Sequence, residues 1–219
     1  MTQLADRMQT LARRFAALSA PERQALQVRM REQGLAFELL PIPPRENASL
    51  PVQASFSQQR LWSLWQLDPQ SSAYNQPALL SVSGALDIPR LTQSLQALVQ
   101  RHEALRTNFC QDEQLVLQVI HPQRAFTLQQ QDLRGSSQSL RDQLTSELTT
   151  QPFDLEHDLL LRASLLQTGD QQWTLVFCTH HIVTDAWSMP ILIEEVLRHY
   201  REQVPAAELP IQYADHARW

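Results

Sequence analysis

The sequence predicts an α/β fold, a mixed β-sheet with covering helices, preceded by a short helical appendage. Three observations lead to this prediction. From residue 51 onward, apolar runs bounded by turn residues alternate with segments whose apolar residues recur at helical spacing. A proline-rich stretch, expected to be a linker over residues 41–50, separates this region from two amphipathic segments. The length of 219 residues and the hydrophobic fraction of 43% leave ample material for a buried core.

The appendage, residues 1–40, is expected to contain two helices. The first, over residues 3–17, carries an apolar stripe with the period of a helix. The second has a clear start signal, with Ser19 as N-cap and Glu22 three residues later, and it ends before Gly34. The amphipathic stripes allow two interpretations: the helices dock a partner protein, or they pack on their own domain.

The domain over residues 51–219 is expected to alternate strands and helices. The expected strands are 77–83, 107–110, 114–120, 125–133, 159–167 and 171–179. The expected helices are 55–66, 89–103, 137–150 and 188–203. The residues expected to face inward are Leu61, Leu64 and Trp65 on the first of these helices, Leu91, Leu95, Leu98 and Val99 on the second, and Ile191, Leu192, Val196, Leu197 and Tyr200 on the last.

The composition excludes several classes of function. All 18 basic residues are arginine, so neither a Schiff-base lysine nor the lysine of a phosphate-binding loop is available. The net charge of -5 and the scattered arginines argue against nucleic acid as a partner. Cys110 and Cys178 lie far apart without a metal-binding pattern, so both are expected to be reduced and mostly buried. No apolar run reaches the length of about 18 residues that a membrane helix needs, and the cytoplasm is the expected location.

One segment combines residue types that carry chemistry. The apolar run of residues 171–179 ends in the adjacent histidines His180 and His181, and Asp185 and Ser188 follow before a helix. Neighbouring residues on an extended chain point to opposite sides, so only one histidine can face a given cleft. An imidazole is suited to general base chemistry near neutral pH. The residue types alone leave two interpretations open, a structural histidine pair or a catalytic one, and they do not favour a metal site.

The segment 180–188, HHIVTDAWS, resembles the HHxxxDG signature of condensation domains of nonribosomal peptide synthetases, within the chloramphenicol-acetyltransferase-like superfamily. Four further segments are similar to motifs of this family and occur in the expected order. They are SFSQQRLWSL at 55–64, RHEALRTNF at 101–109, QPFDL at 151–155 with Leu161-Arg162, and IQYADHARW at 211–219. The resemblance covers residues 51–219 and implies the N-terminal lobe of such a domain.

The resemblance implies an acyltransferase that forms an amide between a donor acyl or peptidyl thioester and an acceptor aminoacyl thioester. It implies that His181 is the catalytic residue, that His180 packs or orders the turn, and that Asp185 is structural and pairs with an arginine from later in the chain. Ser188 is expected to be the N-cap of the last long helix.

Four further motif residues are expected to be structural: Arg60, Arg101, Arg106 and Asp154. The signature departs from the family at Ala186, where a glycine is usual. If that position needs a positive φ or a close approach by the pantetheine arm, the methyl group is unfavourable by roughly 1 kcal/mol; a narrower tunnel, a lower activity and no effect are the three outcomes left open.

The implied partners are donor and acceptor peptidyl carrier proteins, which bring the phosphopantetheine arms; no cofactor or metal is expected to be bound by the chain itself. The chain stops where the first lobe of the family ends, so the C-terminal lobe and the downstream synthetase domains are expected to lie outside it, and the chain alone to be nearly inactive. Two alternatives remain: an epimerisation domain, which inverts an α-carbon, and a catalytically degenerate domain that only binds carrier proteins.

Overall fold

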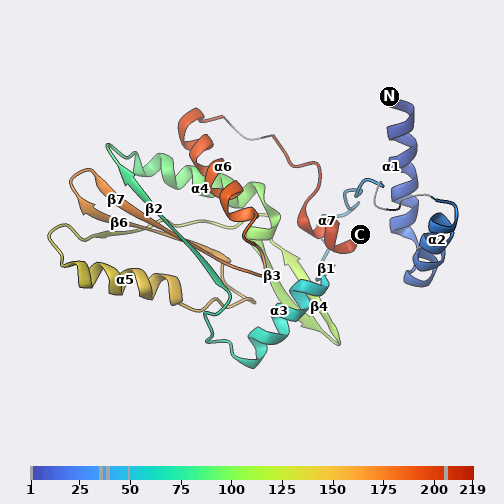
Figure 1. The fold of residues 1–219 in the computed structure, drawn as a ribbon, viewed down its shortest axis with the longest axis horizontal. Helices are drawn as coiled ribbons and strands as arrows, with labels where there is room; N and C mark the ends of the chain where they lie inside the picture. The colour runs from blue at the N-terminus through green and yellow to red at the C-terminus, as the bar shows by residue number, and fades with distance from the viewer. Residues whose placement is uncertain (1, 35–36, 38–39, 49, 205–206) are drawn as a thin grey trace.

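The strands form two sheets in the computed structural model, which describes residues 2–34, 37, 40–48, 50–204 and 207–219 (Figure 1). The four-stranded sheet consists, in spatial order, of β2 (Asn75–Ser83), β7 (Gln172–His180), β6 (Leu161–Gly169) and β5 (Gln129–Asp132). The three-stranded sheet consists of β1 (Val52–Gln53), β4 (Leu115–Ile120) and β3 (Thr107–Asp112). In the larger sheet β5 and β6 are parallel and the other pairs antiparallel. The predicted α/β fold with a mixed sheet is confirmed, and a second, smaller sheet accompanies it.

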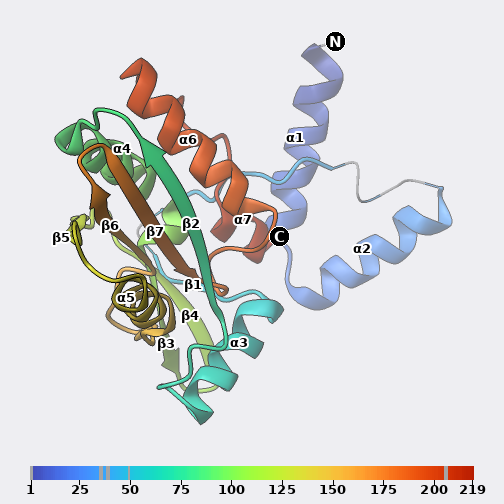
Figure 2. The same ribbon diagram turned by 60° about the vertical axis from the view of Figure 1, so that its left-hand side comes forward.

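Helices cover both faces of the four-stranded sheet (Figures 1 and 2). The helices α4 (Ile88–Arg101) and α6 (Ser188–Glu202) lie on one face, and α5 (Gln138–Thr150) lies on the other. Strand β7 serves both layers because its side chains alternate: Leu175 and Phe177 pack toward α4 and α6, whereas Val176 packs toward α5. This two-sided burial explains why β7 reads as a continuous apolar run in the sequence.

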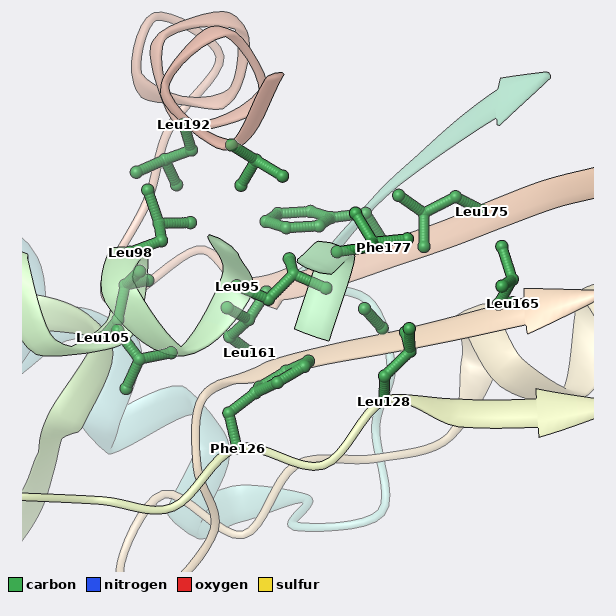
Figure 3. Close-up of a cluster of buried hydrophobic side chains, with 14 residues drawn as sticks. Leu95, Leu98, Leu105, Phe126, Leu128, Leu161, Leu165, Leu175, Phe177 and Leu192 are labelled. Atoms are coloured by element: carbon green, nitrogen blue, oxygen red, sulfur yellow. The ribbon is translucent and has the colours of Figure 1, made fainter. Parts of the chain in front are cut away.

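The main core lies between this sheet and the pair α4 and α6 (Figure 3). The four apolar residues predicted for α4 are all buried there, facing side chains of β6, β7 and α6. On α6, Leu192 and Val196 are buried, and Tyr200 packs at the margin of the core. The predicted inward orientation of Ile191 and Leu197 is wrong, because Ile191 is 53% exposed and Leu197 41%. The buried stripe of α6 is therefore narrower than the periodicity suggested.

A second core joins the three-stranded sheet to α3 (Phe56–Leu67). Ser55 caps α3, and the Gln58 side chain accepts a hydrogen bond from the Ser55 backbone N–H, as the sequence predicted. The residue at the centre of this core is Trp62, which is 1% exposed and packs 6.5 Å from the ring of Phe109. The prediction had instead placed Leu61, Leu64 and Trp65 inward; these three are half-buried at the margin.

Turn positions differ slightly from the prediction. The hairpin of β3 and β4 turns at Glu113 and Gln114, with Glu113 at a φ of 51°, rather than over residues 111–113. Strand β6 continues through Gly169, so its turn into β7 lies at residues 170–171. Strand β5 is limited to four residues.

The two N-terminal helices are confirmed as α1 (Thr2–Ala17) and α2 (Ala20–Glu32), and the Glu22 carboxylate accepts hydrogen bonds from the backbone N–H and hydroxyl of Ser19. They contact the end of the lobe around Trp219, and the interpretation that they dock a partner protein stays a prediction. Trp219 directly follows α7 (Tyr213–Arg218). Its ring lies 5.1 Å from the ring of Phe15 and stacks on the ring of Phe37 at 5.2 Å. None of the helices in the described ranges is both long enough and apolar enough to cross a membrane.

A buried ion cluster fastens the segment before β1 to the lobe. The Arg45 guanidinium pairs with Glu103, at the start of the 3₁₀ turn η2 (Glu103–Arg106), and with Asp215 of α7 at 3.0 Å. The side chains of Arg45 and Asp215 are only 5% and 3% exposed. The segment expected to be a linker therefore contributes Arg45 to a buried charge network.

Replacement of Arg45 by Met should strongly destabilise the protein, because it leaves Glu103 and Asp215 buried without their cation. The expected loss in the free energy of unfolding is about 3–5 kcal/mol, measured by urea denaturation. The control is Arg134→Met, which removes an ion pair with Asp132 at the surface and should change the stability little. Similar midpoints for both variants would contradict the assignment of Arg45 as an anchor.

Candidate functional site

Strand β7 ends at the first histidine of the signature, the second follows directly, and the chain on both sides fixes this end. His180 pairs with Asn75 of β2, and the His180 backbone N–H reaches the Leu160 carbonyl before β6. The His181 backbone N–H donates to the Tyr74 carbonyl at 2.9 Å. A strand held on both sides leaves little freedom in where these side chains point.

His180 lies inside the protein. Its side chain is 3% exposed, between the rings of Tyr74 and Phe153 at 6.3 and 6.1 Å. Its Nδ1 accepts a hydrogen bond from the Ile182 backbone N–H at 3.1 Å, which places the ring proton on Nε2. Burial, with a smaller contribution from the neighbouring His181, lowers the pKa of His180 to about 4. The ring is therefore neutral at physiological pH and packs as part of the core.

His181 points to the opposite side and is exposed. Its Nδ1 lies 2.8 Å from the Thr184 carbonyl oxygen and 2.9 Å from the amide nitrogen of Gln76. Its Nε2 makes no hydrogen bond within the described part of the chain. The ring is thus held at one nitrogen and accessible at the other, the arrangement that a general base requires.

Asp185 and Ser188 close the turn that leads into α6. The Asp185 carboxylate accepts hydrogen bonds from the Ser188 backbone N–H at 2.8 Å and from its hydroxyl at 2.6 Å. These hydrogen bonds from Ser188 lower the pKa of Asp185. The expectation that Ser188 is the N-cap is wrong: it is the first residue of the helix, Trp187 occupies the cap position, and the carboxylate of Asp185 satisfies the free N–H.

The sequence also led to expectations about an arginine partner for Asp185 and about the methyl group of Ala186. Within the described residues no arginine pairs with Asp185. Ala186 is not among the described residues with positive φ, so its methyl group causes no backbone strain in this conformation.

The four motif residues expected to be structural have different surroundings. Arg101 forms an ion pair with Glu195 of α6 at 3.2 Å, and Arg106 donates to the backbone carbonyls of His121 and Gln100. Burial lowers the pKa of Arg106. The Asp154 carboxylate accepts hydrogen bonds from the next turn, from the backbone N–H groups of residues 156 and 157. Arg60 is exposed on α3, and its side chain has no hydrogen bond or ion pair to any described residue.

Metal ligation at the signature has no geometric support. Among the described residues, the group of side chains close enough to share an ion is Asp154, Glu156 and His157, all exposed. The Asp154 carboxylate there already binds the backbone of its own turn.

The sequence did not single out Gln76 or Thr184. Gln76 comes from β2, 105 residues before His181, and only the pairing of Gln76 with Thr179 brings it to the site. No motif marked it, because a glutamine in a strand carries no chemical signature of its own.

The comparisons with known proteins agree on one family. Residues 51–219 match the family model described as the condensation domain. A linear gramicidin synthase of Brevibacillus parabrevis is 41% identical over 187 residues, which cover 81% of this chain and 4% of that protein. Malpinin synthetase of Mortierella alpina is 37% identical over an alignment that covers 99% of this chain and 3% of that protein. The chain thus spans a small part of the curated relatives it matches.

Solved structures share the fold. The X-domain from teicoplanin biosynthesis superposes with a TM-score of 0.72 at 27% identity, covering 82% of this chain and 39% of that one. The starter condensation domain of rhizomide synthetase superposes with a TM-score of 0.66 at 22% identity, covering 74% of this chain and 42% of that one.

The burial of neutral His180 predicts a loss of stability in acid. The unfolded chain binds a proton at this residue near its ordinary pKa of 6.5, whereas the folded protein does so only near 4. Stability contributed by His180 is therefore complete above pH 6.5 and falls as the pH drops towards 4, by up to about 3 kcal/mol.

The measurement is the free energy of unfolding between pH 7 and pH 4.5, with His180→Gln as the comparison. The variant lacks this titration, so its stability should fall less steeply than that of the original protein. Equal slopes would show that the imidazole is not buried in its neutral form.

Proposed function

Because the chain belongs to the condensation-domain family of nonribosomal peptide synthetases, we propose that it is the N-terminal lobe of a domain that joins two carrier-bound thioesters through an amide bond. The observation that carries the proposal is the state of His181: exposed, held at Nδ1 by the Thr184 carbonyl, and free at Nε2. His180, Asp185 and Ser188 support it by fixing the end of β7 and the turn into α6.

In the proposed reaction the acceptor's α-nitrogen attacks the carbonyl carbon of the donor thioester. A new C–N bond forms and the C–S bond breaks. Nε2 of His181 takes the proton that the nitrogen loses, and the departing sulfur of the donor arm takes up a proton in turn. The rigid end of β7 contributes by keeping the imidazole at one place while the substrates vary.

The partners follow from this reaction. Donor and acceptor carrier proteins bring the thioesters, and their phosphopantetheine arms are substrates of this chain rather than a resident cofactor. A C-terminal lobe is proposed to complete the cleft beside His181, and downstream synthetase domains are proposed as further partners. The chain alone is then nearly inactive. The cytoplasmic location expected from the sequence stays a prediction.

A second candidate is a domain that binds partners without forming the amide. The observation that favours it is the similarity to the teicoplanin X-domain, a protein of which a complex with OxyB has been solved. The exposed Trp187 and Ile191 at the start of α6 offer apolar surface for either role.

The decisive variant is His181→Ala in the complete domain. The original domain is mixed with donor- and acceptor-loaded carrier proteins, and intact mass spectrometry follows the mass of the acceptor carrier. That mass should increase by the mass of the donor acyl group. The variant should produce this increase about 100-fold more slowly or worse, because general base catalysis typically contributes a factor of that size or larger.

The matched control is His216→Ala, which removes an exposed histidine of α7 and should leave the rate unchanged. Equal rates for His181→Ala and the original domain would refute the catalytic role. Binding of carriers without any transfer by the original domain would favour the second candidate, and an inverted acceptor α-carbon without a new amide would identify an epimerisation domain.

A further inference from the structure

Gln76 lies at the centre of a polar network beside the histidine pair. Its pairing with Thr179 on β7 directs its side chain to the turn that follows the strand. One end of its amide lies 2.9 Å from Nδ1 of His181, and the other end lies 3.0 Å from the hydroxyl of Thr184. The Thr184 hydroxyl is in turn 2.6 Å from that of Thr179, which is completely buried. The network therefore connects the exposed ring of His181 to a buried side chain of β7.

The chemistry of these groups decides where the ring carries its proton. A backbone carbonyl only accepts hydrogen bonds, so the 2.8 Å contact between the Thr184 carbonyl and Nδ1 requires a proton on Nδ1. With a proton on Nδ1, the Gln76 amide nitrogen at 2.9 Å would set one donor against another. A half turn of the amide, which exchanges its oxygen and nitrogen, removes this conflict. With the oxygen towards the ring, Gln76 becomes a second acceptor for this N–H and donates through its nitrogen to the Thr184 hydroxyl. The hydroxyl keeps an acceptor of its own in the His180 carbonyl at 3.2 Å.

We propose that Gln76 is a positioning residue for His181, which acts with the Thr184 carbonyl to hold the imidazole in the tautomer that carries its proton on Nδ1 and keeps Nε2 free. This inference rests on the proposed function, in which Nε2 takes the proton of the acceptor nitrogen. Gln76 does not touch that nitrogen, and its effect passes through the ring. A neutral ring with the opposite tautomer has its lone pair on Nδ1, where the Thr184 carbonyl blocks it.

The tautomer can be measured without any assay of activity. In protein labelled with ¹⁵N-histidine, the two ring nitrogens of neutral His181 have distinct shifts and proton couplings, and the original protein should show the Nδ1–H form. Gln76→Met has a similar length but no polar group, and it should give a mixture of tautomers. Gln76→Glu offers an acceptor only, and it should retain the Nδ1–H form. Gln130→Met, an exposed position on β5, is the control and should match the original protein.

The kinetic test uses the complete domain with loaded carriers. Gln76→Met should lower kcat roughly tenfold with the KM for the acceptor carrier unchanged, since a wrongly protonated imidazole is a poor base. Gln76→Glu should recover most of that loss. If Gln76 had a purely structural role, Gln76→Glu would not recover the kcat that Gln76→Met loses.

Two results would overturn the inference: an Nε2–H form in the original protein, or an unchanged tautomer and kcat in Gln76→Met. A mixture of tautomers with full kcat would remove the link to catalysis and so also count against it. Failure of the proposed function is recognised separately, because it appears as an undiminished rate in His181→Ala, whatever the tautomer.

Discussion

The pairing of β7 with a neighbour on each side is the constraint on which the rest of the structure depends. Its ladder with β2 runs from Gln172 to His180, and its ladder with β6 fixes the opposite edge. Alternate side chains of β7 build the cores on the two faces of the sheet, and Figure 3 shows Leu175 and Phe177 in the core on the side of α4 and α6. The strand can therefore neither slip nor rotate without exposing both layers, since a shift of one residue would exchange its two faces. Its end inherits this rigidity, and there the two histidines lie.

The same alternation separates the roles of two identical side chains. His180 continues into the protein, where loss of water keeps its ring neutral and the Ile182 N–H occupies its Nδ1. His181, one residue later, faces outward with one nitrogen free. No difference in residue type distinguishes them; only the side of the strand on which each lies does. The buried ring of His180 helps to hold the turn beside His181 in place, because its Nδ1 accepts the Ile182 N–H.

Most of the other motif residues connect elements of the lobe to one another. The segment that begins at Arg101 contributes three contacts to other elements: Arg101 and His102 bind Glu195 of α6, and Glu103 binds Arg45. Asp215 completes the cluster from α7. Buried charges of this kind tolerate little change in geometry, because a displaced partner would leave an uncompensated charge. They connect the segment before β1, the 3₁₀ turn and the last helix across long stretches of chain.

The sequence by itself determined the α/β class, the order of the longer helices and strands, the helix starts at Ser19, Ser55 and Ser137, and the histidine pair at the end of a strand; it missed β1 and α7. These features are local: caps, periodicity and adjacency act within a few residues. The tertiary structure decided what depends on contacts between distant segments. It divided the strands into two sheets, placed Trp62 rather than its neighbours at the centre of a core, turned Ile191 towards solvent, and brought Gln76 from β2 to the ring of His181. Such outcomes depend on strand register and on which helix covers which face, and neither is written in any single stretch of residues.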